Sequence, residues 1–258
     1  KEQFHTTVTL LESVQEITMR IIKWVMYIVP LAVLGLIAQV TSKIGLDALA
    51  GLGIYVLTVL GGLLALMIFY NLVVLIFTST SPREFMKQIR EAQLLAFATS
   101  SSAAVMPISM KIGEEQLKVK KAITEFLIPV GSTVNMDGTA LYQAVATIFL
   151  AQAFGVTLSI GALLSIVVIT VCASIGTPSV PGVGIVVLAT ILQSAGIPAA
   201  GIALILGVDR ILDMSRTTIN VTGNLAACLY FNSRFAKLFA SPAPTPTVEK
   251  KYALFTFL

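Results

Sequence analysis

Long apolar stretches alternate with short polar segments along most of this chain. Residues 21–40 are apolar apart from Lys23 and Gln39, and residues 46–77 form a longer apolar stretch. A helix of about 20 apolar residues crosses the hydrocarbon core of a bilayer, which is ~30 Å thick. Each stretch therefore predicts a membrane-spanning helix, and a polar, amphipathic lead precedes the first one.

A short charged segment follows the second stretch. Ser81 is a favourable N-cap residue, and Pro82 suits the first position of a helix because proline lacks the N–H that would be unpaired there. We expect a surface helix from Pro82 to about Gln93.

The later apolar stretches are interrupted by polar residues. Residues 94–110 are broken by Thr99–Ser102 and by Pro107, and neither half is long enough to span a bilayer. Non-helical backbone at membrane depth is tolerated where protein or a water-filled cavity surrounds it, so a re-entrant helical hairpin is the better interpretation. Three more stretches share polar interruptions or charges: 121–154, broken at Asn135–Thr139; 160–193, broken at Ser174–Gly184; and 199 to about 231, which contains charged residues.

The order of these elements forms a weak internal repeat. A hairpin and a polar-centred helix are followed by a second hairpin and a second polar-centred helix. Paired interruptions in two halves of a membrane protein indicate a substrate site in transporters. Re-entrant segments also occur in channels, but the repeat favours a transporter.

Composition supports a membrane setting. The 258 residues are 56% hydrophobic and 12% charged, about half the charged content of an ordinary soluble domain. The net charge of +4 lies mainly in short segments between the apolar stretches, as in cytoplasmic loops. No basic face with interleaved aromatic residues is present, so we expect no nucleic-acid partner. The proline-rich residues 241–258 predict a disordered tail.

Cysteine and histidine offer little chemistry. Cys172 and Cys228 both lie within apolar runs and are best interpreted as small core residues, without a disulfide or a metal site. His5 is the single histidine of the sequence, which leaves no basis for a histidine metal site or a catalytic triad.

The last long helix carries a polar stripe. Successive residues of a helix advance by about 100°, which places six polar side chains within roughly 100° of one another over four turns. They are Asp209, Asp213, Arg216, Thr217, Asn220 and Asn224. Each charged side chain at the centre of a membrane costs about 3 kcal/mol, so the stripe faces protein or water and indicates a functional site. The alternative is a buried Asp–Arg pair that joins helices, but such pairs stabilise weakly and need no neighbouring Thr or Asn.

The break at Asn135–Thr139 is the second polar cluster. Gly138 permits unwinding, which frees backbone carbonyls for a cation, and Asn135 and Asp137 add oxygen ligands that suit Na⁺. The alternative is a kinked helix with one buried acid that neighbouring groups satisfy.

The hairpin tips are rich in Ser, Gly and Pro. Their helix ends present backbone amides that suit a carboxylate, although ordinary loops are the alternative. Catalysis is disfavoured because Ser101 has no base in its own span. Arg216 beside Asp213 also holds that carboxylate ionised, unlike a protease pair that shares a proton. We therefore predict that the protein is not an enzyme.

These motifs occur in the same order in the glutamate/aspartate transporters. The chain resembles that dicarboxylate/amino acid:cation symporter family, in its carboxyl-terminal part, over roughly residues 15–235. The resemblance implies an all-α membrane protein with an elevator fold, two re-entrant hairpins and interrupted helices, as a homotrimer in the cell membrane. It further implies a scaffold-type helix with an amphipathic lead at 1–43, a transport domain at 44–240 with hairpins near 94–112 and 160–193, and the tail at 241–258.

The resemblance also implies roles for individual residues. Arg216 would bind a side-chain carboxylate of the substrate, and Asp213 its α-ammonium. The rest of the substrate pocket would be Ser101, Ser102, Thr139, Val180, Gly184, Thr217 and Asn220. One cation would lie among Gly131, Asn135, Asn220 and Asn224. A second would bind oxygens of Thr133, Met136, Ser174, Ile175 and Thr177, and Asp137 would belong to a third.

Two departures from the family pattern stand out. Asn224 replaces an aspartate of the sodium-coupled members, which removes a negative charge and leaves coupling to Na⁺ or to H⁺ open. Members of the family also often carry an extra arginine at the position of Ser100 or Met214, and this chain has none there.

The leading hypothesis is cation-coupled symport of acidic amino acids, aspartate or glutamate. A guanidinium suits a second carboxylate, while the aspartate needs an amine on the same substrate. A cystine symporter is the nearer alternative. A C4-dicarboxylate symporter ranks lower because its substrate has no ammonium, and an ion channel ranks lower still.

Overall fold

The computed structural model describes residues 51–235 throughout, the backbone of 47–50, and isolated positions between residues 6 and 38. The described residues form helices and connecting turns, with no strand among them. The isolated positions are all helical, but most of the predicted first span, and the whole predicted tail at 241–258, lie outside the described residues. The elements are α2 (Asp47–Phe77), α3 (Pro82–Thr99), α4 (Ser102–Glu115), α5 (Lys121–Val134), α6 (Asp137–Ala153), α7 (Ile160–Ile175), α8 (Val183–Ser194), a 3₁₀ turn η1 (Ala199–Gly201) and α9 (Ile202–Phe235).

Helix α2 matches the second apolar helix predicted from the sequence. Within the described part of the chain, its segment Gly51–Phe77 is the one uninterrupted helix long and apolar enough to cross a membrane. Large apolar side chains on its outer face are open, such as Ile54 at 67% and Leu57 at 70% of full exposure. Contiguous apolar surface of this kind suits lipid or another protein surface.

The first hairpin begins earlier than predicted. Ser81 caps α3 as expected, since its side chain accepts the N–H of Glu84 at 3.2 Å. The prediction that this helix ends near Gln93 is wrong, because it continues to Thr99. An unbroken buried stripe explains the extension, since it runs past Gln93 at helical spacing: Phe85, Ile89, Ala92 and Ala96.

The chain reverses at the serine run. Ser100 adopts a left-handed conformation (φ 53°), which ends α3, and the Ser101 side chain caps α4 by accepting the N–H of Ala104 at 3.3 Å. The helices α3 and α4 therefore form the arms of the first hairpin, with the serines at its tip.

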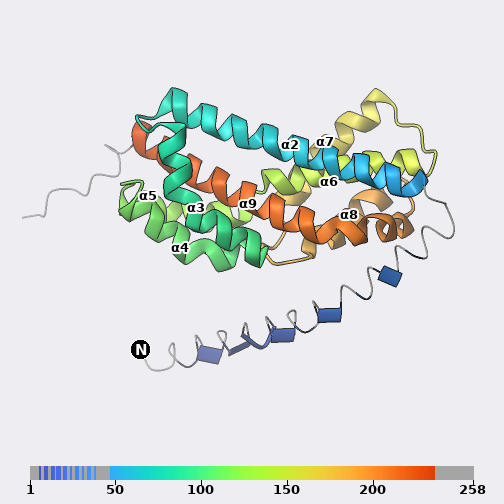
Figure 1. Ribbon diagram of the computed structural model, residues 1–258, viewed down its shortest axis with the longest axis horizontal. Coiled ribbons are helices and arrows are strands. Elements are labelled where there is room, and N and C mark those ends of the chain that lie inside the picture. The colour runs from blue at the N-terminus through green and yellow to red at the C-terminus, as the bar shows by residue number, and fades with distance from the viewer. Residues whose placement is uncertain are drawn as a thin grey trace, which may run out of the picture.

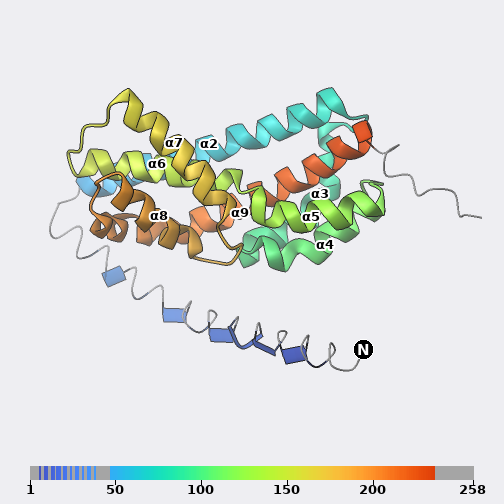
Figure 2. The same cartoon turned by 180° about the vertical axis from the view of Figure 1, so that it is seen from behind.

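The other two predicted interruptions are confirmed. Helices α5 and α6 are separated by the non-helical residues Asn135 and Met136, and Figure 2 shows the two helices following one another along the length of the molecule. Helices α7 and α8 form the second hairpin, whose tip ends at Gly182 with φ 79°, a backbone conformation that glycine adopts without strain.

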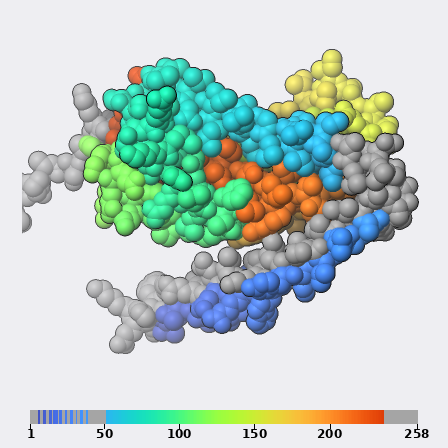
Figure 3. All heavy atoms as spheres, viewed as in Figure 1, coloured from blue at the N-terminus to red at the C-terminus, as the bar shows by residue number. Residues whose placement is uncertain are grey.

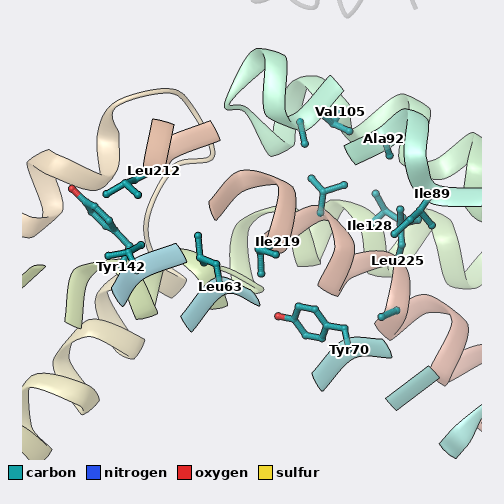
Figure 4. Packing of buried hydrophobic residues seen from close by; sticks show 14 of the residues in the cluster. Leu63, Tyr70, Ile89, Ala92, Val105, Ile128, Tyr142, Leu212, Ile219 and Leu225 are labelled. Carbon is teal, nitrogen blue, oxygen red and sulfur yellow. The ribbon is translucent and has the colours of Figure 1, made fainter. Parts of the chain in front are cut away.

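Helix α9 lies at the centre of the arrangement. It contacts α2, α3, α4, α5, α6 and α8, and it runs between α2 and the hairpins (Figure 1). On the face shown in Figure 3, α9 reaches the surface between α2 and the first hairpin. The apolar core follows its length, and Leu212, Ile219 and Leu225 of α9 belong to one buried cluster with Leu63 and Tyr70 of α2 (Figure 4). This packing brings both hairpin tips and the start of α6 to the middle of α9.

Candidate functional site

A cavity lies where the hairpin tips meet α6 and α9. Its volume is about 20 Å³, room for roughly one water molecule, and its lining is polar. Eight of the nine residues predicted to bind substrate line it: Ser102, Thr139, Val180, Gly184, Asp213, Arg216, Thr217 and Asn220. It is also lined by residues that the sequence did not single out as substrate ligands: Ser100, Met136, Thr177, Pro178 and Ser179.

Ser101, the ninth predicted residue, lies beside this lining. Its hydroxyl donates to the carbonyl of Ser179 at 2.8 Å, which joins the tip of the first hairpin to the tip of the second. Its role in substrate binding stays a prediction.

Arg216 is the electrostatic centre of the site. Its side chain is buried, and Nε and Nη2 donate to Asp213 Oδ1 at 3.1 and 2.9 Å. Its third nitrogen, Nη1, lies 3.9 Å from Asp209 Oδ1, and neither atom has a hydrogen-bond partner. The guanidinium carbon lies 4.3 Å from the ring centre of Tyr142, a cation–π distance. One guanidinium nitrogen, Nη1, therefore has no hydrogen bond, and it lies on the side that faces Asp209.

The tip of the second hairpin packs directly on this charged pair. The N–H of Gly182 donates to Asp213 Oδ2 at 3.1 Å. Gly184 lies so close to Arg216 that a Cβ there would overlap the guanidinium. The Gly184 carbonyl also accepts from Gln143 Nε2 at 3.3 Å. A larger residue at 184 would displace the guanidinium from its present position, so the tip and the charges of α9 form one unit.

Asn220 joins α9 to the break before α6. Its Oδ1 accepts the N–H of Gly138 at 2.8 Å, and its Nδ2 donates to Thr139 Oγ1 at 3.1 Å. A side-chain oxygen that accepts a first-turn N–H acts as an N-terminal cap. Thr217 is held in place by its own helix, since its hydroxyl donates to the carbonyl of Asp213 at 2.8 Å.

The structure brings together part of the predicted first cation site. The carboxamides of Asn135 and Asn224 lie 2.9 Å apart. The amide nitrogens are identified by their neighbours: Asn224 lies 3.1 Å from the Gly131 carbonyl oxygen, and Asn135 lies 2.7 Å from Asp137 Oδ2. Both amides therefore present N–H groups to these oxygens. Asn220 is committed to α6 instead, so this set offers a cation hydrogen-bond donors and no formal negative charge of its own.

The residues of the second predicted cation site have mixed surroundings. Met136 and Thr177 line the cavity, and the carbonyl of Met136 accepts the N–H of Ala140 at 2.9 Å. The carbonyl of Ser174 accepts the N–H of Thr177 at 3.1 Å. Thr133 and Ile175 are exposed. The described residues contain no group of three His, Cys, Asp or Glu side chains that could hold a metal ion.

Reasoning from the sequence did not single out Tyr142 and Gln143. Both lie one turn after Thr139 on the buried face of α6, where the chain reads as an ordinary apolar helix with two larger polar residues. Their polar groups within an apolar helix were the available signal for a functional role. Their contacts with Arg216 and Gly184 could not be predicted because they depend on how α9 and α8 pack against α6.

An all-helical bundle with a charged centre, enclosed by two hairpins and an interrupted helix, is the architecture of a membrane carrier. Comparison with known proteins agrees. The sequence model of the sodium:dicarboxylate symporter family matches residues 1–234. The chain belongs to this family, which confirms the resemblance inferred from its motifs.

Several curated proteins are similar to this chain. Excitatory amino acid transporter 3 of Oryctolagus cuniculus is 38% identical over 225 residues, which cover 86% of this chain and 43% of the relative. Excitatory amino acid transporter 1 of Ambystoma tigrinum is 40% identical over 227 residues, which cover 87% and 42%. The proton/sodium-glutamate symport protein of Bacillus subtilis (strain 168) is 38% identical over 237 residues, which cover 92% and 54%. The chain thus spans about half the length of these relatives.

Proposed function

We propose that this chain provides the substrate-binding part of a cation-coupled symporter for acidic amino acids. Membership of the sodium:dicarboxylate symporter family supports transport, and relatives named for excitatory amino acids and for glutamate support the substrate class. The observation that carries the proposal is the buried Arg216, which lines the cavity together with Asp213. A cationic and an anionic group side by side match a substrate that carries both a carboxylate and an ammonium.

The exchange of partners at Arg216 gives a mechanism for binding. Asp213 now occupies two N–H groups of Arg216. A substrate carboxylate would replace it in a two-point contact with the guanidinium, and the released Asp213 would accept the ammonium. The remaining carboxylate would meet the first-turn amides of α4 at the serine tip, where the helix dipole favours an anion.

The domain organisation follows the same proposal. Residues 44–240 would form the moving transport domain and residues 1–43 a scaffold helix, in a multi-pass homotrimer of the cell membrane that works as an elevator. Na⁺ or H⁺ would be the coupling ion. The proton/sodium-glutamate symport protein among the relatives, together with Asn224 in the first cation site, supports keeping both ions in the proposal.

Substrate binding by the purified full-length protein tests the proposal. We expect L-aspartate to raise Tm in Na⁺ buffer, and Arg216→Ala to weaken aspartate affinity on the order of 100-fold, since a charge-assisted contact contributes roughly 3 kcal/mol. The control is Arg234→Ala, because Arg234 packs on the Phe77 ring, away from the cavity lining. Unchanged aspartate affinity in Arg216→Ala would refute the assignment. Binding of succinate, which has no amine, tests the alternative of a C4-dicarboxylate symporter, and binding of cystine tests the alternative of a cystine symporter.

A further inference from the structure

The acid of the α5–α6 break has a partner on α2. Tyr70 lies on α2 with its ring buried, at 6% of full exposure. Its hydroxyl donates to Asp137 Oδ2 at 2.5 Å, across 67 positions of sequence. Asp137 is the acid that the resemblance assigns to a cation. One of its two carboxylate oxygens therefore already accepts a hydrogen bond from a protein hydroxyl.

The surroundings hold Tyr70 tightly in this position. Gly223 of α9 faces it so closely that an added Cβ would lie 2.7 Å from Tyr70 Cζ and 2.8 Å from its oxygen. The same Cβ would lie 2.7 Å from the side-chain amide of Asn135. Tyr70 and Asn135 thus converge on Asp137 through a space that exists because residue 223 has no side chain.

Asn135 occupies the carboxylate from a second direction. Its amide N–H lies 2.7 Å from Asp137 Oδ2 and 3.1 Å from Oδ1, and its oxygen accepts from Asn224. Among the described residues, no arginine or lysine forms an ion pair with Asp137. The carboxylate borders an apolar groove of about 300 Å³ between α2, α6 and α7, whose walls include Leu66, Leu141 and Val167. Protein O–H and N–H groups therefore supply its polar contacts here.

We infer that Tyr70 is a specificity-determining residue for the coupling ion, because its hydroxyl competes with a cation for the Asp137 carboxylate. A sodium ion needs oxygen lone pairs, and a hydroxyl that donates to the carboxylate presents its hydrogen to that position. A sodium ion that binds Oδ2 of Asp137 must displace the Tyr70 O–H from that oxygen, whereas Oδ1 has only the 3.1 Å contact with Asn135. The Tyr70 hydroxyl thus occupies a position on Asp137 that a cation would otherwise take. This inference rests on the proposed symport function.

The test is the Na⁺ dependence of Tm of the purified full-length protein, with choline replacing Na⁺ at constant ionic strength and without substrate. Removal of the hydroxyl in Tyr70→Phe should lower the Na⁺ concentration at half-maximal stabilisation about tenfold, the equivalent of one charge-assisted hydrogen bond of about 1.4 kcal/mol. The gain should disappear in the Tyr70→Phe/Asp137→Asn double variant. Tyr230→Phe is the matched control, since it removes the same atom from a tyrosine that packs on Phe77 and Phe231.

An unchanged Na⁺ midpoint in folded Tyr70→Phe overturns the inference, as does a gain that survives loss of Asp137. If Tyr70→Phe does not fold, infrared difference spectra of the wild type against Asp137→Asn give an independent readout. Saturating Na⁺ in place of choline should shift the Asp137 carboxylate band together with a tyrosine C–O band; a carboxylate shift that leaves the tyrosine bands unchanged, or no carboxylate shift at all, overturns the inference. These measurements need no aspartate. Failure of aspartate binding therefore counts against the proposed function alone, and an unchanged Na⁺ response counts against Tyr70 alone.

Discussion

Gly223 offers a sharp test of the packing at the centre of α9. A Gly→Ala change inside a helix normally stabilises by roughly 0.5–1 kcal/mol, because alanine loses less backbone entropy on folding. At Gly223 the added Cβ would lie 2.7 Å from both Tyr70 Cζ and the Asn135 amide. Ordinary contacts between such atoms are about 3.5–4.0 Å, so both neighbours would have to move. Overpacking of this kind costs about 1–3 kcal/mol, so we expect Gly223→Ala to destabilise by about 1–2 kcal/mol after the gain in helix propensity.

Thermal unfolding in detergent measures this effect. Gly223→Ala should lower Tm by a few degrees. Gly61→Ala on α2, where an added Cβ meets nothing within 4 Å, should leave Tm equal to that of the wild type or above it. Tyr70→Leu in the Gly223→Ala background should recover part of the loss, since it removes one of the two close neighbours. If Gly223→Ala is as stable as Gly61→Ala, the close approach of α2, α9 and the α5–α6 break is refuted.

Three further changes probe the site itself. Asn224→Asp restores a negative charge beside the Gly131 carbonyl and should increase the Na⁺ dependence of aspartate uptake in reconstituted vesicles with separately imposed Na⁺ and pH gradients; no change would mean that this position does not set the coupling ion. Tyr142→Leu removes the ring beneath Arg216 and should weaken aspartate binding, measured by calorimetric titration, about tenfold. Tyr142→Phe keeps the ring and should bind aspartate nearly normally; equal losses in both variants would exclude the cation–π contact. Asp213→Asn removes the anion that accepts Gly182 N–H and should reduce aspartate affinity while affecting succinate little, because only aspartate has an ammonium to lose; a parallel loss for both ligands would contradict that role.

Most of the fold could be predicted from the polar interruptions of the apolar stretches. Asn135–Thr139 and Ser174–Gly184 contain polar, glycine and proline residues in numbers that a continuous membrane helix does not tolerate, so the breaks were predictable from local sequence. The end of α3 was not predictable in this way, since Leu94–Thr99 can either continue the helix that begins at Pro82 or start a separate hairpin arm. The buried face that α3 presents to α4 and α9 makes it one continuous helix.

The candidate site was predictable as far as helical periodicity reaches. The spacing of Asp213, Arg216 and Asn220 placed them on one face, and all three line the cavity. Contacts between separate helices were beyond that reasoning. Nothing in the sequence near Tyr70 indicates Asp137, because their meeting depends on how α2 crosses the start of α6 and on the missing side chain at Gly223.

The buried stripe also implies a charge balance for the whole cycle. At formal charges Asp209, Asp213 and Arg216 leave one negative charge in the interior, and Asp137 adds another beside the apolar groove. An acidic amino acid would bring one more, and moving unbalanced charge through a low-dielectric region is expensive. On the proposed function, cations that enter with the substrate would make the loaded protein close to neutral, so coupling would follow from electroneutrality as well as from ligand geometry. An asparagine at 224 would lower by one the number of positive charges required, so each cycle would draw less driving force from the ion gradient than in a relative with an aspartate there.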